Sequence, residues 1–495
     1  ALPICSGYAS VRRRKAVMTK KRHTFTQKST LHPHEEVRRI YWEPLVVRRI
    51  TQRNALSAVT SDSTLAAVIM VSAAFVAIIV ANTPAYGFVR SMLELPLEIG
   101  IGSFIVSISC EQFINDFLMA IFFLLVGVEL KYEMTVGQLR HPKQAALPML
   151  AAVGGVIVPA LIFLACNFKG AAHGWATPIA TDIAFALGVM SLLGDRVAVE
   201  TKVFFQTLAI ADDIIAIGVL ALFYGQTFKI EWVVGSLFVT FILSLLNHGR
   251  VYSLKPYVAV GALLWICMFN SGIHATLAGV ILAFFLPARS DVRLGELHGW
   301  LDDQALELDD HYDERSHVLG QHDFTEAAWH VERVMHHVRP PLQRMERYYA
   351  VPVNFVILPL FAFVNAQVRL VGVDLSALLV DPIVRGVFFG ALIGKPIGVI
   401  GMTTLLVKLG PFSLPRHMDW RQLVTMGLLS GVGFTMSILI AGLAFTNLVE
   451  ANAAKCAVLA AAVVASAAGL FFAALSDSFR TGHGQTRPSK LTAPR

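Results

Sequence analysis

The stretch that decides the fold is Val203–Tyr224, VFFQTLAIADDIIAIGVLALFY. It is long enough for one helix to cross the hydrocarbon core of a bilayer. Its only charged residues are Asp212 and Asp213, which fall near the middle of the stretch. Insertion scales assign about 2.5–3.5 kcal/mol to an ionised Asp at that depth, and adjacent carboxylates also repel each other. A helix that only packs gains nothing from such a pair, so the stretch predicts an ion or proton site within the membrane.

Composition places the chain among the polytopic helical membrane proteins. Hydrophobic residues make up 55% of its 495 residues and charged residues 15%, whereas soluble domains carry about 25% charged residues. We predict an all-α membrane protein with twelve transmembrane helices, at 64–86, 114–130, 145–167, 176–193, 203–224, 232–248, 255–269, 271–287, 353–370, 384–408, 421–446 and 453–475.

Lys and Arg are distributed unequally between the two sides that these spans define. One side carries 34 of them and the other 6, and without the basic N-terminal arm the ratio is still 21 to 6. An even number of spans puts both termini on the same side. The positive-inside rule therefore predicts that both termini are cytoplasmic.

The sequence divides into three regions. A polar arm, 1–56, precedes the transmembrane domain, 57–478, and a tail, 479–495, follows it. The arm has a net charge of +10 between Arg12 and Arg53, and it lacks the apolar segment of a signal peptide. A nucleic-acid-binding arm is the alternative, but a basic arm before a first span more often marks the cytoplasmic side and contacts anionic membrane lipids. We therefore expect no nucleic-acid partner.

A polar insert, 288–352, interrupts the transmembrane domain. Twelve acidic residues and seven histidines lie between Asp291 and Arg339. No pair of them has the spacing of a recognised metal site. The composition favours a solvated, partly disordered cytoplasmic linker. A regulatory role is the alternative, because histidines titrate near neutral pH.

A hairpin is predicted at 93–109, between the first two spans. Two short apolar runs lie on either side of Gly102-Ser103, as in a β-hairpin with a two-residue turn. It would lie outside the membrane with strand edges free to pair with a second copy, so it is a candidate surface for a homodimer. Ordinary packing of a loop is the alternative.

Two predicted spans contain breaks. In the fourth, Pro178 removes a helix hydrogen bond and Thr181-Asp182 can cap a restarted helix. The eleventh contains Gly431-Val-Gly433. Irregular backbone is tolerated at membrane depth only beside a cavity or packed protein.

The two breaks occupy corresponding places. Each lies in the middle span of a three-span group, 145–224 or 384–475, and the two groups start on opposite sides of the membrane. Inverted repeats with broken helices indicate a transporter site. Close packing of Gly- and Ser-rich helices is the alternative.

Other polar residues lie in or beside the spans. Glu129 and Glu133 share one helix face at the cytoplasmic end of the second span, where they either are simply solvated or form an acidic mouth that attracts cations. Lys395 is alone in apolar surroundings, and a carboxylate of span four or five is its natural counter-charge. His274 begins the eighth span and either packs as a hydrogen-bonded residue or takes part in proton-linked function.

Several strings closely resemble the NhaA family of bacterial sodium/proton antiporters, in unbroken order over residues 57–478. They are Ala180-Thr181-Asp182-Ile-Ala-Phe-Ala-Leu-Gly188, Leu208-Ala-Ile-Ala-Asp212-Asp213, Phe122-Phe-Leu-Leu-Val-Gly127-Val-Glu129, His274-Ala-Thr276-Leu-Ala-Gly279, Leu358-Pro-Leu-Phe-Ala-Phe-Val-Asn365-Ala366, Gly394-Lys395-Pro396 and Gly431-Val-Gly433-Phe-Thr435-Met-Ser.

The resemblance implies that the fourth and eleventh helices are discontinuous and cross near the midplane, and that one sodium or lithium site alternates between the two faces. Asp212 and Asp213 are then the pair that binds ion and proton. Thr181 and Asp182 lie at the unwound crossing. Lys395 is the charge partner of the pair and of the helix ends.

The resemblance also implies a response to pH, at Glu129, Glu133, Glu346 and His274. Three positions depart from the family pattern: Tyr132 stands where the mouth usually has Arg, and Arg347 and Ala350 stand where it often has His. These departures concern the pH profile and leave the ion site unchanged.

The predicted function is antiport of cytoplasmic sodium or lithium against external protons, electrogenic and pH-regulated, in a bacterial inner membrane. The chain is then not an enzyme and needs no cofactor. A sodium-coupled symporter of organic anions would not need adjacent carboxylates. An intramembrane aspartyl protease would carry its two Asp on separate helices, one in a Gly-x-Gly-Asp string that this sequence lacks. A cation channel would not need inverted broken helices.

Overall fold

In the residues that it describes, the secondary structure of the computed structural model is helical apart from one two-stranded hairpin. It describes residues 63–101, 104–140, 142–168, 170–225, 229–290, 294–313, 315–369, 375–415 and 417–481. The predicted N-terminal arm, 1–56, and most of the predicted tail, 479–495, lie outside these ranges.

Eleven helical segments of the described residues are long and apolar enough to cross a membrane: Thr64–Ala81, Cys110–Thr135, Ala145–Asn167, Ala172–Leu192, Val199–Phe223, Ile230–His248, Leu254–Ser271, Pro341–Asn365, Pro382–Leu409, Trp420–Ala444 and Leu448–Ser476. Where the sequence predicts a further span at 271–287, the structure has a shorter helix, α13 (Leu277–Phe285). The chain is therefore a helical multi-pass membrane protein.

The predicted hairpin is confirmed. Strand β1 (Pro96–Ile101) pairs antiparallel with β2 (Phe104–Ser109), from Pro96 opposite Ser109 to Ile101 opposite Phe104. This register leaves two residues for the connection, as expected for a tight hairpin.

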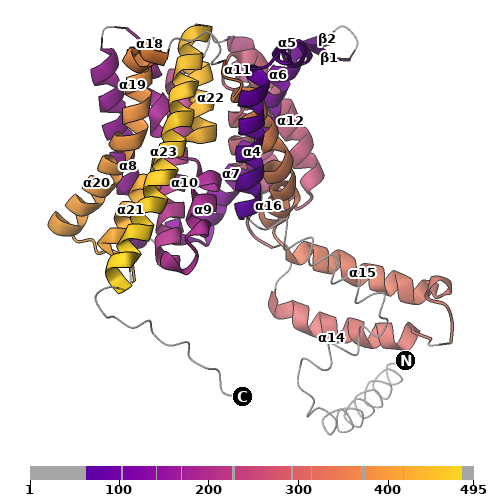
Figure 1. Cartoon of the computed structure of the whole chain (residues 1–495). Helices are drawn as coiled ribbons and strands as arrows, with labels where there is room; N and C mark the ends of the chain where they lie inside the picture. The colour runs from indigo at the N-terminus through magenta and orange to yellow at the C-terminus, as the bar shows by residue number, and fades with distance from the viewer. Residues whose placement is uncertain are drawn as a thin grey trace, which may run out of the picture. The chain divides into compact units, whose positions relative to one another are not determined.

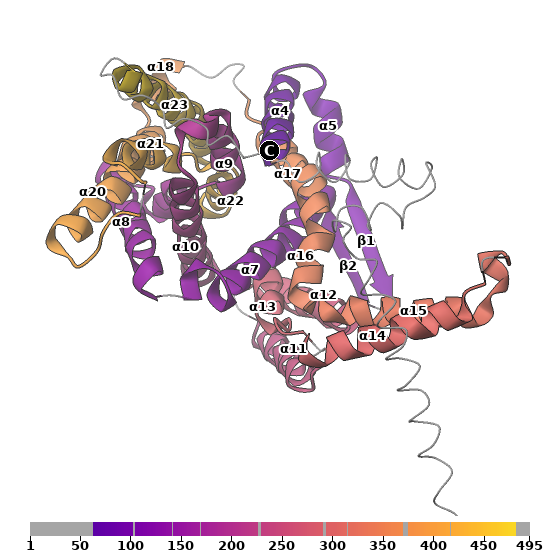
Figure 2. The ribbon, with the colours of Figure 1, turned by 90° about the horizontal axis from the view of Figure 1, so that it is seen from below.

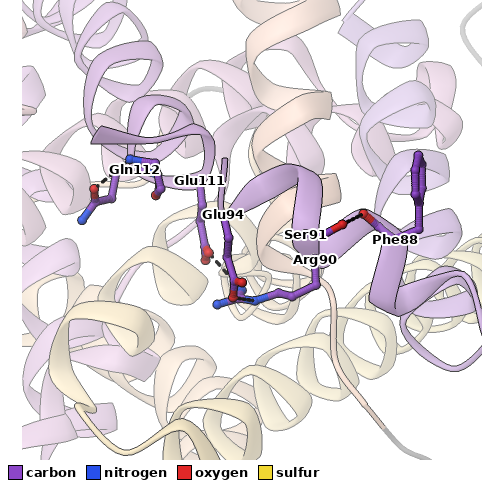
Figure 3. Close-up of polar contacts among 7 residues, drawn as sticks. Phe88, Arg90, Ser91, Glu94, Glu111 and Gln112 are labelled. Atoms are coloured by element: carbon purple, nitrogen blue, oxygen red, sulfur yellow. Dashed lines mark hydrogen bonds and ion pairs between the residues drawn. The ribbon is translucent and has the colours of Figure 1, made fainter. Parts of the chain in front are cut away.

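An ion-pair network holds the base of the hairpin. The guanidinium of Arg90, on α5 (Tyr86–Leu93), lies between two carboxylates (Figure 3): its Nε is 2.6 Å from Glu94 and its Nη1 is 2.9 Å from Glu111. Glu111 belongs to α6 (Cys110–Gln112), which directly follows β2. The network therefore ties the segment before the hairpin to the segment after it.

The insert differs from its prediction. We predicted a partly disordered linker, but its described residues form two helices, α14 (Leu294–His311) and α15 (His322–Val338), which lie side by side (Figure 1). The prediction was also too long at its end, because α16 (Pro341–Pro352) begins the membrane-crossing segment that continues into α17 (Leu358–Asn365).

The physical reason for the helical insert is the spacing of its few apolar residues. On α15, Phe324, Ala327, Val331 and Val334 recur every three or four positions and are at least partly buried. This is the pattern of an amphipathic helix. The overall composition is polar and acidic, so composition alone does not reveal this narrow apolar face.

Two helices inside the transmembrane domain are in direct contact through their backbones. Helix α8 (Pro142–Asn167) lies beside both α20 (Lys395–Leu409) and α10 (Val199–Phe223) (Figure 2). A Cβ on Gly398 of α20 would meet the carbonyl oxygen of Gly154 on α8, and a Cβ on Gly154 would meet that of Gly398. Only glycines permit this approach, and it brings the first turn of α20 close to α10.

Candidate functional site

Two interrupted helices cross inside the transmembrane domain. The first is a 3₁₀ segment, η3 (Ala172–Ile179), followed by three non-helical residues and then α9 (Ile183–Leu192). The second consists of α21 (Trp420–Ser430) and α22 (Phe434–Ala444). Each break thus leaves helix ends inside the protein, where their free backbone groups need partners.

The non-helical residues of the two breaks contact each other directly. The backbone N–H of Asp182 donates to the carbonyl oxygen of Val432 at 2.7 Å, and the Thr181 hydroxyl donates to the carbonyl of Ser430 at 3.0 Å. A Cβ on Gly433 would meet the carbonyl oxygen of Ala180. The glycine predicted to break the second helix is therefore also what allows the close crossing.

Asp182 caps both restarted helices. Its Oδ1 accepts the backbone N–H of Phe185 at 3.0 Å, which confirms the predicted cap of α9. Its Oδ2 accepts the backbone N–H and the hydroxyl of Thr435, at 3.1 and 2.8 Å, in the first turn of α22. A carboxylate at two helix N-termini is favoured by both helix dipoles.

Asp212 and Lys395 form a buried ion pair beside the crossing. Lys395 Nζ lies 2.5 Å from Asp212 Oδ2, and the exposed fractions of the two side chains are 1% and 0%. Lys395 Nζ also donates to the carbonyl oxygen of Ile179, the last residue of η3. The predicted counter-charge for Lys395 is thus Asp212 of span five, and the ammonium also faces the negative end of a broken helix.

Asp213 completes a cluster of oxygens. Its side chain is 4% exposed, and it interacts electrostatically with Asp212, Asp182 and Lys395. Within the described residues, Oδ1 of Asp212 and Oδ1 of Asp213 are buried and accept no hydrogen bond. Buried carboxylate oxygens without donors are the ligands that a proton or a hard cation such as sodium would satisfy.

Three of the four predicted pH-response residues lie together. Glu129 and Glu133 belong to α7 (Met119–Thr135) and Glu346 to α16, and these helices pack against each other. Glu129 interacts electrostatically with both other carboxylates. His274 lies elsewhere: its Nε2 is 2.6 Å from the carbonyl oxygen of Tyr224, at the end of α10.

Sequence reasoning did not identify two participants of this site. Thr435 is the partner of Asp182, and its signal was its place just after the glycine break, where a restarted helix needs a cap. The carbonyl of Ile179 is free to accept from Lys395 because the 3₁₀ segment ends at that residue, and nothing in the residue type reveals that role.

The site lies within a region shared with known proteins. Residues 57–473 match the family model described as Na+/H+ antiporter 1. The chain belongs to this family of antiporters. It is therefore a transporter and not an enzyme, and such antiporters need no cofactor.

Similar proteins carry the name Na(+)/H(+) antiporter NhaA. The one from Dichelobacter nodosus is 36% identical over 442 residues, which are 89% of this chain and 95% of that protein. The one from Helicobacter pylori strain G27 is 40% identical, over 82% of this chain and 91% of that protein. The one from Wolinella succinogenes is 40% identical, over 77% and 85%. The predicted NhaA family is thus confirmed.

A solved structure is more distantly similar. The sodium proton antiporter MjNhaP1 from Methanocaldococcus jannaschii aligns with a TM-score of 0.44 and 12% identity, over 86% of this chain and 98% of that chain.

Proposed function

We propose that this NhaA-family chain exchanges cytoplasmic sodium or lithium for external protons. The observation that carries the proposal is the buried ion pair of Asp212 and Lys395, next to Asp213 and to the crossing of two broken helices. A purely structural ion pair would not need a second buried carboxylate beside it, whereas an exchanger needs oxygens that take either a proton or a cation.

In this proposal Asp212 and Asp213 bind the transported ion and the protons. Thr181, which lies close to Asp212, adds oxygen ligands from its hydroxyl or the freed backbone. Asp182 and Lys395 balance the charges of the helix ends. Asp182 is suited to this because it already accepts three hydrogen bonds from α9 and α22.

Competition for the same oxygens couples the two fluxes. A sodium ion that approaches Asp212 competes with the ammonium of Lys395 for Oδ2, and it displaces protons from the carboxylates. Protons that arrive from outside displace sodium in turn. If more than one proton is exchanged per sodium ion, the cycle moves net charge, and the membrane potential then drives extrusion. We propose that the exchange is electrogenic in this sense.

We further propose a twelve-span topology with inverted repeats. α13 is then the eighth span, and the groups 145–224 and 384–475 are the two repeats, each with a broken middle helix. The Lys and Arg distribution supports cytoplasmic termini in a bacterial inner membrane. Membrane lipids surround the domain, and the free edges of the β1–β2 hairpin support a homodimer.

Regulation by pH is proposed for two places. The cluster of Glu129, Glu133 and Glu346 would attract cations at the cytoplasmic end of α7, and its charge depends on pH. His274, bonded to the carbonyl oxygen of Tyr224 at the C-terminal end of α10, would sense pH there.

The test is exchange in everted membrane vesicles, with a pH-sensitive dye and added sodium, lithium or potassium. Asp212→Asn and Asp213→Asn should each abolish sodium-dependent dequenching. Asp323→Asn, an exposed carboxylate on α15, is the matched control and should retain it. Full activity of either site variant would refute the assignment. Sodium flux without proton movement would favour a channel, and a need for an organic co-substrate would favour a symporter.

A further inference from the structure

A cavity of about 1520 Å³ lies where the insert meets the membrane-spanning helices. Its walls come from the first turns of α12 (Leu254–Ser271), from the end of α15, and from α16. Neither Asp212 nor Asp213 lines this cavity, so the proposed ion exchange does not explain it.

Most of the charged residues that line the cavity are basic. Lys255, Arg339, Arg344 and Arg347 line it, together with His336 and His337, and Glu346 is the one carboxylate among its described lining residues. The basic groups are close enough to influence one another. Burial lowers the pKa of His336, and the nearby charges of Arg344, His337 and Arg339 lower it further, against the opposite effect of Glu332. Like charges gathered in this way repel each other unless an anion lies between them.

Arg344 is the most informative of these residues. It is 9% exposed, its Nη2 donates to the carbonyl oxygen of Tyr252, and its Nε is buried without an acceptor among the described residues. No carboxylate of the described residues pairs with it within ion-pair distance. A buried guanidinium without a counter-charge is strongly unfavourable, so a negative group is expected in the cavity that it lines.

The start of α12 contributes a second source of positive potential. Ser253 is the N-cap residue, and its side chain accepts no hydrogen bond from the helix. Ser253, Leu254 and Lys255 all line the cavity. The N–H groups of Leu254 and Lys255, which precede Pro256, and the dipole of this 18-residue helix favour an anion there.

We propose that this cavity binds a phosphate-bearing anion. Arg344 and Arg347 supply guanidinium groups that can hold phosphate oxygens in pairs, Lys255 supplies a point charge, and the start of α12 supplies backbone N–H groups. A lipid headgroup and a soluble phosphate share this chemistry. Because α15 and α16 both line the cavity, a bound phosphate joins the insert to the helix that carries Glu346.

The experiment measures binding to the full chain. Inorganic phosphate and pyrophosphate are titrated onto the protein in neutral detergent. In a second arm, the protein is placed in phosphatidylcholine nanodiscs with or without phosphatidylglycerol, and its thermal stability is compared. Saturable phosphate or pyrophosphate binding supports a soluble ligand. Stabilisation by phosphatidylglycerol alone supports a lipid headgroup. Either result supports the proposed site if the substitutions described below abolish the binding or the stabilisation.

Arg347→Gln and Arg344→Gln should each weaken binding roughly tenfold or more, because a charge-assisted hydrogen bond is lost. Arg344→Gln also removes the bond to Tyr252 and can impair folding, so Arg347, which is exposed, is the decisive position. The matched control is Arg333→Gln on α15, whose guanidinium stacks 3.7 Å from the Trp329 ring and does not line the cavity.

A second readout is the titration of His336, followed by NMR of labelled histidine. Bound phosphate should raise its pKa in the wild type and in Arg333→Gln, and not in Arg347→Gln. The proposal is overturned if no arm detects binding, or if Arg333→Gln and Arg347→Gln lose it equally.

Discussion

Thr435 gives both of its hydrogen-bond donors to one oxygen of Asp182: its backbone N–H lies 3.1 Å and its hydroxyl 2.8 Å from Oδ2. The two residues are 253 positions apart in the sequence. Since Asp182 also caps α9, this pair joins the starts of two restarted helices. The two breaks are therefore one structural unit.

Removal of the Thr435 hydroxyl tests that unit. Thr435→Val keeps the side-chain shape but leaves Asp182 with one donor fewer in a buried place. We expect the free energy of unfolding to fall by about 1–3 kcal/mol, measured by chemical unfolding in detergent. Thr435→Ser keeps the donor and should remain close to the wild type. Equal stability of the Val variant and the wild type would contradict this.

The ion pair of Asp212 and Lys395 is suited to a double-mutant cycle. Lys395→Met leaves a buried carboxylate without its counter-charge, and Asp212→Asn leaves a buried ammonium. Each single variant should lose about 3–5 kcal/mol of stability if the remaining group stays charged. The double variant should be more stable than either, since neither member of the pair remains charged after loss of its partner. If the two losses simply add, the groups do not interact.

The backbone contact between α8 and α20 predicts a clear contrast between two glycines of one helix. Gly398→Ala should destabilise the protein by about 1–3 kcal/mol, because its Cβ meets the backbone of Gly154. Gly401→Ala, where nothing lies within 4 Å of the added Cβ, should be neutral or slightly stabilising. Thermal unfolding of the two variants in the same detergent distinguishes them. Similar melting temperatures would mean that the contact is loose.

The insert can be unfolded without touching the ion site. Ala327 is the buried residue on the face of α15, at 9% exposure. Ala327→Asp places a carboxylate on that face and should open the pair α14–α15, seen as faster proteolysis within 294–338. Glu332→Gln, on the exposed side of α15, is the control. Sodium-dependent dequenching should persist in both variants. Loss of exchange in Ala327→Asp alone would mean that the insert takes part in transport.

The sequence allowed prediction of the buried charged cluster, which we propose as the ion site, because a charge within an apolar helix is rare and unfavourable. For that reason the sequence identifies Asp212, Asp213 and Lys395 as candidates. The Pro and Gly breaks indicate where backbone groups lose their helical partners. The sequence does not predict which carboxylate pairs with Lys395. That Asp212 and not another carboxylate meets Lys395 depends on how α8, α10 and α20 pack.

The insert was mispredicted for the opposite reason. Its acidic and histidine-rich composition is typical of a disordered linker. The few apolar residues form a narrow helix face, which stabilises a helix only when a second helix packs against it. Arg344 likewise lies within the predicted polar insert, 288–352, and nothing in its sequence context sets it apart. Its burial against Tyr252 could not be inferred without the course of the chain after α15.

The glycine contact between α8 and α20 also limits how the protein can move. α8 belongs to the first three-span group and α20 to the second. Where two backbones touch without side chains between them, sliding of the helices is restricted, because a shift beyond Gly154 and Gly155 brings a larger residue into the contact. They can still rotate about it. We therefore expect the two groups to turn about Gly154 and Gly398 as a pivot, so that small rotations there become larger displacements at the two ends of the proposed ion pathway.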